Sequence, residues 1–144
     1  MIGAVDLRGD LENWCANYVD AFERYDVEAI GAHWAFPAMI ISGPGQSILR
    51  DQDKFNRNTT GLMAFYKRQD VLRVVRTILS YEPLSEDIAA MRVHDVVWST
   101  SDEQIVEWVS AYVLRRTPEG WRAIFADATG EVDAWAARGT PLGS

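Results

Sequence analysis

The spacing of apolar residues changes along the chain from a helical to a strand-like pattern. Between residues 11 and 25, apolar side chains recur at steps of three and four, which predicts a helix with Asp10 as its N-cap. A second, shorter helix is expected to begin at Asp26 and to run through Trp34, before Pro37 ends the helical stretch. The face of the first helix that we expect in the core carries Leu11, Trp14, Cys15, Tyr18, Ala21, Phe22 and Tyr25.

A short hairpin and a third helix are predicted next. Residues 39–41 and 47–49 are expected to form two short strands, because a turn sequence rich in glycine and proline separates them at residues 43–46. The third helix follows, with Asp51 or Asp53 as its cap. Its apolar residues are Phe55, Leu62, Met63, Phe65 and Tyr66.

Four extended segments, separated by turns, follow residue 70. They cover residues 71–82, 88–98, 104–116 and 121–129. Helices followed by a long antiparallel meander predict an α+β fold in which a curved sheet wraps over the helices and encloses a pocket. The whole chain, residues 1–144, is expected to form one domain with a core of about residues 10–130. Residues 131–144 would add a short helix at 133–138 and a tail.

Two motifs in this arrangement resemble the nuclear transport factor 2-like superfamily. They are the step between helices, Tyr25-Asp-Val-Glu-Ala-Ile30, and the hairpin Tyr112-Val-Leu-Arg-Arg-Thr-Pro-Glu-Gly-Trp-Arg122. The superfamily includes ketosteroid isomerase and SnoaL-like polyketide cyclases. The resemblance implies a SnoaL-like domain with the cystatin-like architecture, a cone-shaped half-barrel with one deep apolar cavity, commonly built as a homodimer. It does not imply one chemistry, because function depends on the site and not on the fold.

Composition and charge narrow the classes of partner. Six Trp, five Tyr and five Phe are many for 144 residues, and a cavity wall is a common place for such a surplus. The net charge of −7 argues against a nucleic-acid partner. A lone Cys15 and two His without paired ligand spacing argue against a bound metal. The sequence has no glycine-rich phosphate loop, which argues against a nucleotide, so neither a metal nor a cofactor is expected. No apolar run approaches the length of a membrane span and residues 1–5 are too short for a signal peptide, so we expect a cytoplasmic protein without a membrane partner.

The resemblance implies candidate catalytic residues. Lining up residues 26–30 with the same step in ketosteroid isomerase places Tyr18 on the tyrosine that stabilises the oxyanion there. Ser42 falls where that enzyme keeps its aspartate base, and Tyr112 falls where it keeps a protonated carboxylic acid, so one of three roles is matched. The cyclases instead place an aspartate acid/base on the last long strand, where this chain has Asp127. Its apolar neighbours would raise the pKa of a buried Asp127, whereas at the end of the sheet it would cap or pair locally.

The strand patterns suggest which side chains face the cavity. In the segment 104–116, Trp108, Ser110 and Tyr112 share one face, which suits a cavity wall. The opposite face, with Val109, Ala111 and Val113, suits packing against a second subunit, although a register slip of one residue would exchange the two faces. In the preceding strand, the superfamily pattern turns Arg92, His94, Val96 and Trp98 inward, and His94 would then serve as a proton carrier. The alternative places Met91, Val93 and Val97 inside and makes the Arg92 face a polar stripe towards solvent.

These residues support one leading hypothesis and one alternative. The leading hypothesis is a small-molecule-binding SnoaL-like enzyme, an isomerase, cyclase or lyase, that performs cofactor-free acid/base chemistry on an apolar carbonyl compound. Asp127 would be the acid/base, Tyr18 would donate to the carbonyl oxygen, and His94 would assist. The alternative is a non-catalytic ligand-binding or dimerisation module of the same fold, for which the lack of a carboxylate at Ser42 argues. The expected ligand-binding wall comprises Trp34, Ser42, Trp98, Trp108, Ser110, Tyr112 and Phe125.

Overall fold

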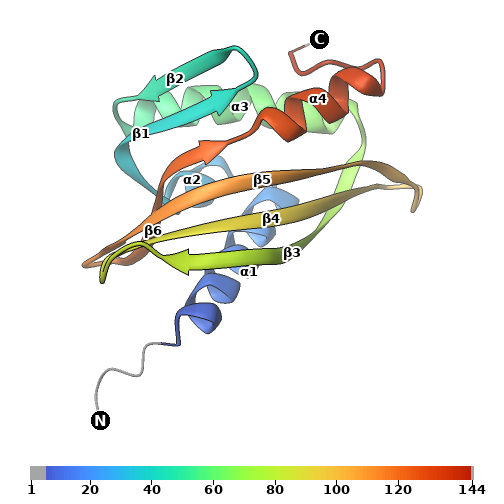
Figure 1. Ribbon diagram of the computed structural model, residues 1–144. Helices are drawn as coiled ribbons and strands as arrows, with labels where there is room; N and C mark the ends of the chain where they lie inside the picture. The colour runs from blue at the N-terminus through green and yellow to red at the C-terminus, as the bar shows by residue number, and fades with distance from the viewer. Residues whose placement is uncertain (1–5, 144) are drawn as a thin grey trace.

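The computed structural model describes residues 6–143 as helices packed against one strongly bent sheet (Figure 1). Residues 1–5, on which the argument against a signal peptide depends, lie outside the described residues. In chain order the elements are α1 (Leu7–Glu23), α2 (Val27–Gly31), β1 (Trp34–Ser42), β2 (Gly45–Leu49), α3 (Gln52–Arg68), β3 (Val71–Pro83), β4 (Ile88–Ser99), β5 (Gln104–Thr117), β6 (Gly120–Asp127) and α4 (Thr129–Ala137).

The strands form one mixed sheet in the order β2-β1-β6-β5-β4-β3. The four strands β3 to β6 pair antiparallel in sequence order, as the turn signals between them predicted. The expectation of a purely antiparallel sheet is wrong in one place, because β1 lies parallel to β6. This pairing joins the N-terminal hairpin to the meander and so extends the curved sheet around the helices. The α+β fold with helices packed in a curved sheet is confirmed.

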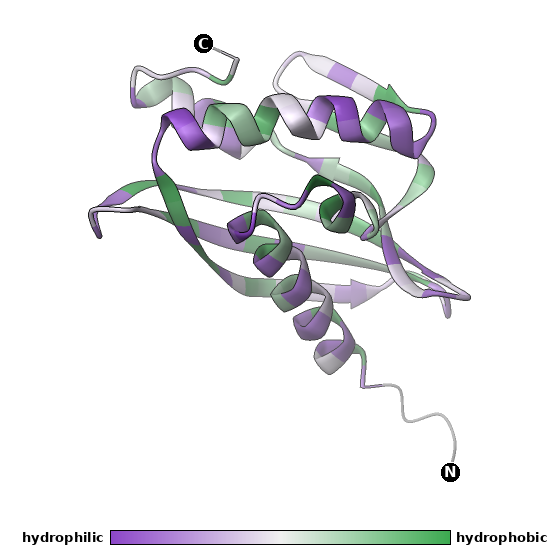
Figure 2. Cartoon of the chain, turned by 180° about the vertical axis from the view of Figure 1, so that it is seen from behind, coloured by the Kyte–Doolittle hydropathy of each residue, from purple (hydrophilic) through white to green (hydrophobic). Residues whose placement is uncertain are grey.

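In the part of the chain that the structure describes, the helices cover one face of this sheet and leave the other face without a helix. Figure 2 shows α1 and α3 in front of the sheet, whereas Figure 1 looks onto the uncovered side of β3 to β5. The core lies between the sheet and the helices, and the expected inner face of α1 is confirmed, with Leu11, Trp14, Cys15 and Tyr18 all buried. α4 adds Trp135, which is fully buried against Phe65.

Several element boundaries differ from the sequence expectations. α1 begins one turn earlier, because Asp6 and not Asp10 accepts the capping hydrogen bond from the first turn. α2 ends at Gly31, and Pro37 lies inside β1 instead of ending a helix, since Trp34 already pairs with β6. α4 begins at Thr129 instead of residue 133, so the last strand ends at Asp127. Asp51 caps α3, as one of the two expected alternatives.

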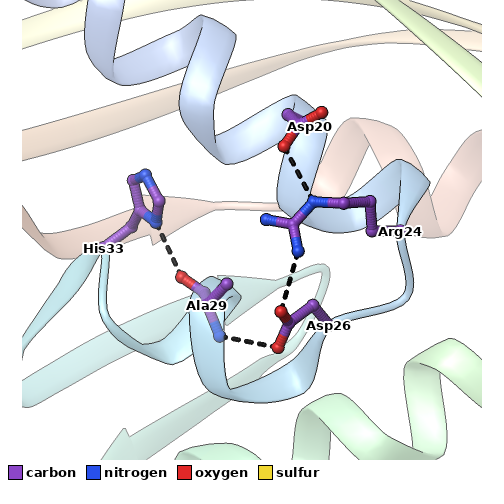
Figure 3. Close-up of polar contacts among 5 residues, drawn as sticks. All are labelled: Asp20, Arg24, Asp26, Ala29 and His33. Atoms are coloured by element: carbon purple, nitrogen blue, oxygen red, sulfur yellow. Dashed lines mark hydrogen bonds and ion pairs between the residues drawn. The ribbon is translucent and has the colours of Figure 1, made fainter.

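The joint between α1 and α2 is held by polar contacts on the surface (Figure 3). The guanidinium of Arg24 donates to Asp20 and to Asp26, both at 2.8 Å. Asp26 also accepts from the backbone N–H of Ala29 at 3.1 Å, which caps α2, and His33 Nδ1 donates to the carbonyl of Ala29 at 2.8 Å. These contacts fix the direction in which the chain leaves α2 for β1.

Close packing of α4 against β5 predicts a difference between two glycine substitutions. A Cβ on Gly130 would lie 2.3 Å from the carbonyl oxygen of Val109, whereas a Cβ on Gly61, in the middle of α3, would meet nothing within 4 Å. We expect Gly130→Ala to lower the free energy of unfolding by roughly 1–3 kcal/mol, because backbone must shift. Gly61→Ala is expected to raise it by up to about 1 kcal/mol, since alanine is the better helix former.

Urea denaturation of the two variants and the wild-type protein measures this difference. A Gly130→Ala variant as stable as the wild type would contradict the close approach of α4 to β5.

Candidate functional site

A small cavity between the helices and the inner face of the sheet is lined by several polar side chains. Its volume is about 40 Å³, and it lies among α1, α3, the start of α4 and the inner face of β3 to β5. Aromatic and aliphatic side chains surround the polar ones, so few waters compete with them. The polar groups that line the cavity belong to Tyr18, Tyr66, Arg76, Asp95, Tyr112 and Glu131.

A buried ion pair forms the floor of this cavity. Arg76 on β3 lies opposite Asp95 on β4 and binds it in a fork, with Nε 2.7 Å from Oδ1 and Nη2 2.8 Å from Oδ2. The side chains are only 7% and 2% exposed. Nη2 also donates to the hydroxyl of Tyr112 at 3.0 Å, and the rings of Tyr18 and Tyr112 lie against the guanidinium. Such a pair is tolerated in an interior only with this geometry, because each charge has lost its water.

The other charged group of the cavity is Glu131, in the first turn of α4. The residue as a whole is half-buried, but its Oε2 accepts hydrogen bonds from the hydroxyl of the buried Tyr66 and from Nε1 of Trp135 at 3.2 Å. Burial raises the pKa of Glu131 from its ordinary 4.5 to about 7, and the negative charge of Asp95 contributes in the same direction. The hydrogen bonds from Tyr66 and Trp135 and the positive charge of Arg76 offset part of this rise.

Two larger spaces adjoin this cavity. An apolar chamber of about 190 Å³ lies under α3 towards β1, and it shares Tyr18 and Phe22 with the cavity. The hydroxyl of Tyr18 accepts from Nε1 of Trp34 at 2.9 Å, which fixes both side chains in the chamber wall. On the other side, a groove of about 520 Å³ between α1 and β3 reaches Arg76, which lines both the groove and the cavity.

The structure brings several of the predicted site residues together. Tyr18, Trp108 and Tyr112 line the cavity, and Trp34 lines the adjoining chamber. Ser110 is buried on the same face of β5. The expected inner face of this strand is therefore confirmed, and the alternative with the two faces exchanged is wrong.

Other predicted residues lie on the uncovered face of the sheet. On β4 the inward face carries Met91, Val93, Asp95 and Val97, so the inward assignment of Arg92, His94, Val96 and Trp98 is wrong and the alternative holds. His94 Nε2 lies 3.4 Å from Glu107 on this outer face, and Trp98 packs under the guanidinium of Arg73. Burying Arg92 and His94 without partners would have been costly, which explains the outcome.

Asp127 is also on the outer face, because it pairs with Ala111 of β5. Its Oδ1 accepts from the backbone N–H of Thr129 at 3.0 Å, and hydrogen bonding by Thr129 lowers the pKa of Asp127 instead of raising it. The expectation of a buried acid/base at this position is wrong, and the local capping alternative holds.

Phe125 shares this outer face, opposite Val113. Ser42 is at the end of β1 beside the hairpin turn, where it pairs with Gly45, and it lines neither the cavity nor the chamber.

The sequence reasoning missed Arg76, Asp95 and Glu131, although each left a signal. Asp95 falls at a two-residue step between Val93 and Val97, and Arg76 falls between Val74 and Ile78 in the same way. A charge in such a position implies a buried partner on the neighbouring strand. Glu131 precedes Trp135 by four residues, a helical spacing that places both on one face.

The sequence matches the family model of the NTF2-like protein (DUF6841) over residues 9–130. The chain belongs to this NTF2-like family. No curated protein matches the sequence.

Solved structures of the same fold include proteins from several bacteria. An NTF2-like protein of unknown function from Shewanella oneidensis MR-1 superposes with a TM-score of 0.67 at 14% identity, covering 83% of this chain and 96% of that one. A ketosteroid isomerase-like protein from Erwinia carotovora atroseptica gives a TM-score of 0.62 at 16% identity, covering 83% and 92%. A cystatin-like domain of unknown function from Nostoc punctiforme gives 0.67 at 16%, covering 83% and 74%. At these identities the likeness establishes the fold alone.

Among residues 6–143, no helix is long and apolar enough to cross a membrane.

The environment of Glu131 predicts how stability depends on pH. The folded protein holds the Glu131 proton up to a pKa of about 7, whereas the unfolded chain releases it near 4.5. The contribution of Glu131 to stability is therefore full below about pH 4.5 and is lost as the pH rises through 7. We expect wild-type protein to lose roughly 3 kcal/mol relative to Glu131→Gln over this range.

Denaturation at a series of pH values measures this loss, and Asp133→Asn, an exposed carboxylate on the same helix, is the matched control. A difference between wild type and Glu131→Gln that stays constant from pH 4.5 to 8 would show that the carboxyl is not held in a desolvated site.

Proposed function

We propose that this protein is a small-molecule-binding, SnoaL-like enzyme that performs cofactor-free acid/base chemistry on an apolar carbonyl compound, with Glu131 as the acid/base. The observation that carries the proposal is a carboxyl group with a pKa of about 7 facing a cavity that also holds the Arg76 guanidinium. A general acid/base is most effective when its pKa lies near the working pH. One protein of the same fold is ketosteroid isomerase-like, and the proposal extends that class of chemistry to this chain without naming a substrate.

The residues around the cavity suggest how one proton transfer would proceed. Tyr66 and Trp135 both donate to Oε2 of Glu131. The other oxygen, Oε1, has no hydrogen-bond partner among residues 6–143. Oε1 would remove a proton from the carbon next to the ligand's carbonyl group, and the electron pair of that C–H bond would move to form an enolate. Donors at Arg76 and Tyr112 would stabilise the enolate oxygen, and Glu131 would then return the proton to the same or another carbon.

The volumes of the two spaces set the size of the ligand. The chamber of about 190 Å³ and the neighbouring cavity of about 40 Å³ are smaller than the roughly 300–1,000 Å³ pockets that hold drug-sized ligands. An apolar cavity of about 150 Å³ can hold benzene, so the chamber suits a single six-membered ring.

The exchange of α-hydrogens for deuterium in cyclohexanone tests the role of Glu131. In D₂O, wild-type protein should catalyse exchange at a rate that rises with pH through about 7, because the ionised carboxylate is the base. Glu131→Gln should exchange roughly two to four orders of magnitude more slowly, while cyclohexanone still binds. Proton NMR follows the loss of the α-hydrogen signal, with Asp127→Asn as the control for loss of a carboxylate outside the cavity.

A non-catalytic binding module is the alternative, and the hydrogen bonds that already engage Oε2 of Glu131 favour it. In that case cyclohexanone would bind, but wild type and Glu131→Gln would both exchange at the rate of buffer alone.

We further propose that the protein is a homodimer formed through the uncovered face of the sheet. Along β5 this face carries Val109, Ala111 and Val113, and Phe125 of β6 lies opposite Val113. These apolar side chains form a patch beside charged residues of the same face, such as Glu107 and Asp127, and an apolar patch rimmed by polar residues is typical of a protein interface. Light scattering at micromolar concentration should give about twice the 16.2 kDa chain mass.

Ala111→Arg should yield a monomer, whereas Thr100→Arg, at an exposed turn, should leave the dimer intact. A wild-type monomer at high concentration would refute the dimer.

A further inference from the structure

Three hydrogen-bond donors on side chains that line the cavity have no nitrogen or oxygen acceptor among residues 6–143. Nη1 of Arg76 is buried and has no nitrogen or oxygen partner, although the guanidinium also interacts with the thiol of Cys15, a weak acceptor. The hydroxyl oxygens of Tyr18 and Tyr112 accept from Trp34 and Arg76, respectively, but no described group accepts either hydroxyl hydrogen. Both oxygens of Asp95 are already occupied by Arg76. A buried guanidinium N–H without a partner is costly, so the site is short of one strong acceptor.

The charges around the site disfavour an anion as that acceptor. Asp95 already neutralises Arg76, and Glu131 adds a carboxyl to the same cavity. The groove that reaches Arg76 carries three acidic residues and one other basic residue, namely Glu12, Asp20, Glu23 and Arg8. Two of these carboxylates are paired, Glu12 with Arg8 and Asp20 with Arg24, so the groove adds no surplus positive charge. A carboxylate or phosphate that reached Arg76 would find no uncompensated positive charge there.

We infer that the ligand is an electrically neutral, monocyclic compound whose single carbonyl oxygen accepts from Nη1 of Arg76 and from the hydroxyls of Tyr18 and Tyr112. Its apolar ring would occupy the chamber under α3, because Tyr18 lines both the chamber and the cavity. This inference rests on the proposed function and adds to it the charge and the orientation of the ligand. Arg76 becomes a residue that determines specificity.

The affinities of three six-membered ring compounds test the inference. Cyclohexanone supplies a neutral acceptor oxygen, cyclohexanecarboxylate supplies a charged one, and methylcyclohexane supplies none. Titrations followed by the indole N–H signals of Trp34 and Trp108, in the walls of the two spaces, give the three dissociation constants. We expect cyclohexanone to bind at least roughly tenfold more tightly than either of the others, the effect of one hydrogen bond to a charged donor.

Two variants identify the donors. Removing Arg76 alone would leave Asp95 as an unpaired buried charge, so the pair is replaced together as Arg76→Met/Asp95→Leu, which keeps an apolar interior. This variant should bind cyclohexanone roughly ten- to a hundredfold more weakly and methylcyclohexane unchanged. Arg73→Met, on the same strand with its side chain 51% exposed, is the matched control. Tyr18→Phe removes one donor hydrogen, should weaken ketone binding several-fold, and provides the test if the double variant does not fold.

The outcomes separate this inference from the proposed function. Equal binding of the ketone and the carboxylate, no binding of any of the three compounds, or ketone binding unchanged in the folded variants would overturn the inference. If the ketone binds as expected but wild type and Glu131→Gln exchange deuterium equally, the proposed function fails and the assignment of the ligand class stands.

Discussion

The interior of this protein depends on the buried ion pair between Arg76 and Asp95. Each charge loses several kcal/mol of hydration inside the core, and the loss is offset only because both guanidinium–carboxylate bonds form at 2.7 and 2.8 Å. The two residues lie directly opposite each other on β3 and β4, so a slip of one residue would turn one of them to the outer face and leave the other unpaired. The pair therefore fixes the register of the strands that form the floor of the site, at a position where apolar residues alone would tolerate neighbouring registers.

The same pair determines the chemistry of the groups around it. The guanidinium donates through Nε and Nη2 to Asp95, which fixes its plane, and its buried Nη1 has no nitrogen or oxygen partner among residues 6–143. Asp95 contributes to the raised pKa of Glu131, while Arg76 opposes it, so a change in either residue would move the pH at which Glu131 ionises. Structural and chemical roles are therefore combined in two side chains, and neither Arg76 nor Asp95 is expected to be replaceable alone without a cost in stability.

The sequence predicted the helices and the meander well because their signals are local. Apolar spacing placed the core face of α1, and alternation along β5 identified Trp108, Ser110 and Tyr112 as inward residues. The candidate site was predicted only in part. Four predicted residues lie between the helices and the inner face of the sheet, namely Tyr18, Trp34, Trp108 and Tyr112. Asp127 and His94 lie on the uncovered face of the sheet. The partners of Arg76 and Glu131 lie 19 and 65 residues away along the chain, and such pairings become visible only when the strands and α4 are placed in space. Glu131 was missed because the start of α4 was expected four residues too late.

A purely structural carboxyl group would be expected to have both oxygens satisfied, since an interior that buries an acid stabilises it best by saturating its acceptors. Glu131 departs from this expectation in a specific way. Tyr66 and Trp135 both donate to Oε2, and together they hold the orientation of the group, while Oε1 has no donor among the described residues. In the proposed mechanism, this arrangement would present the free oxygen in a fixed direction, without an internal bond to break before it accepts a proton. Arg76, whose Nη1 has no nitrogen or oxygen partner among residues 6–143, lines the same cavity. Under the proposal, an acceptor and a donor without partners beside one cavity would suit a ligand with both a proton to give and an oxygen to receive.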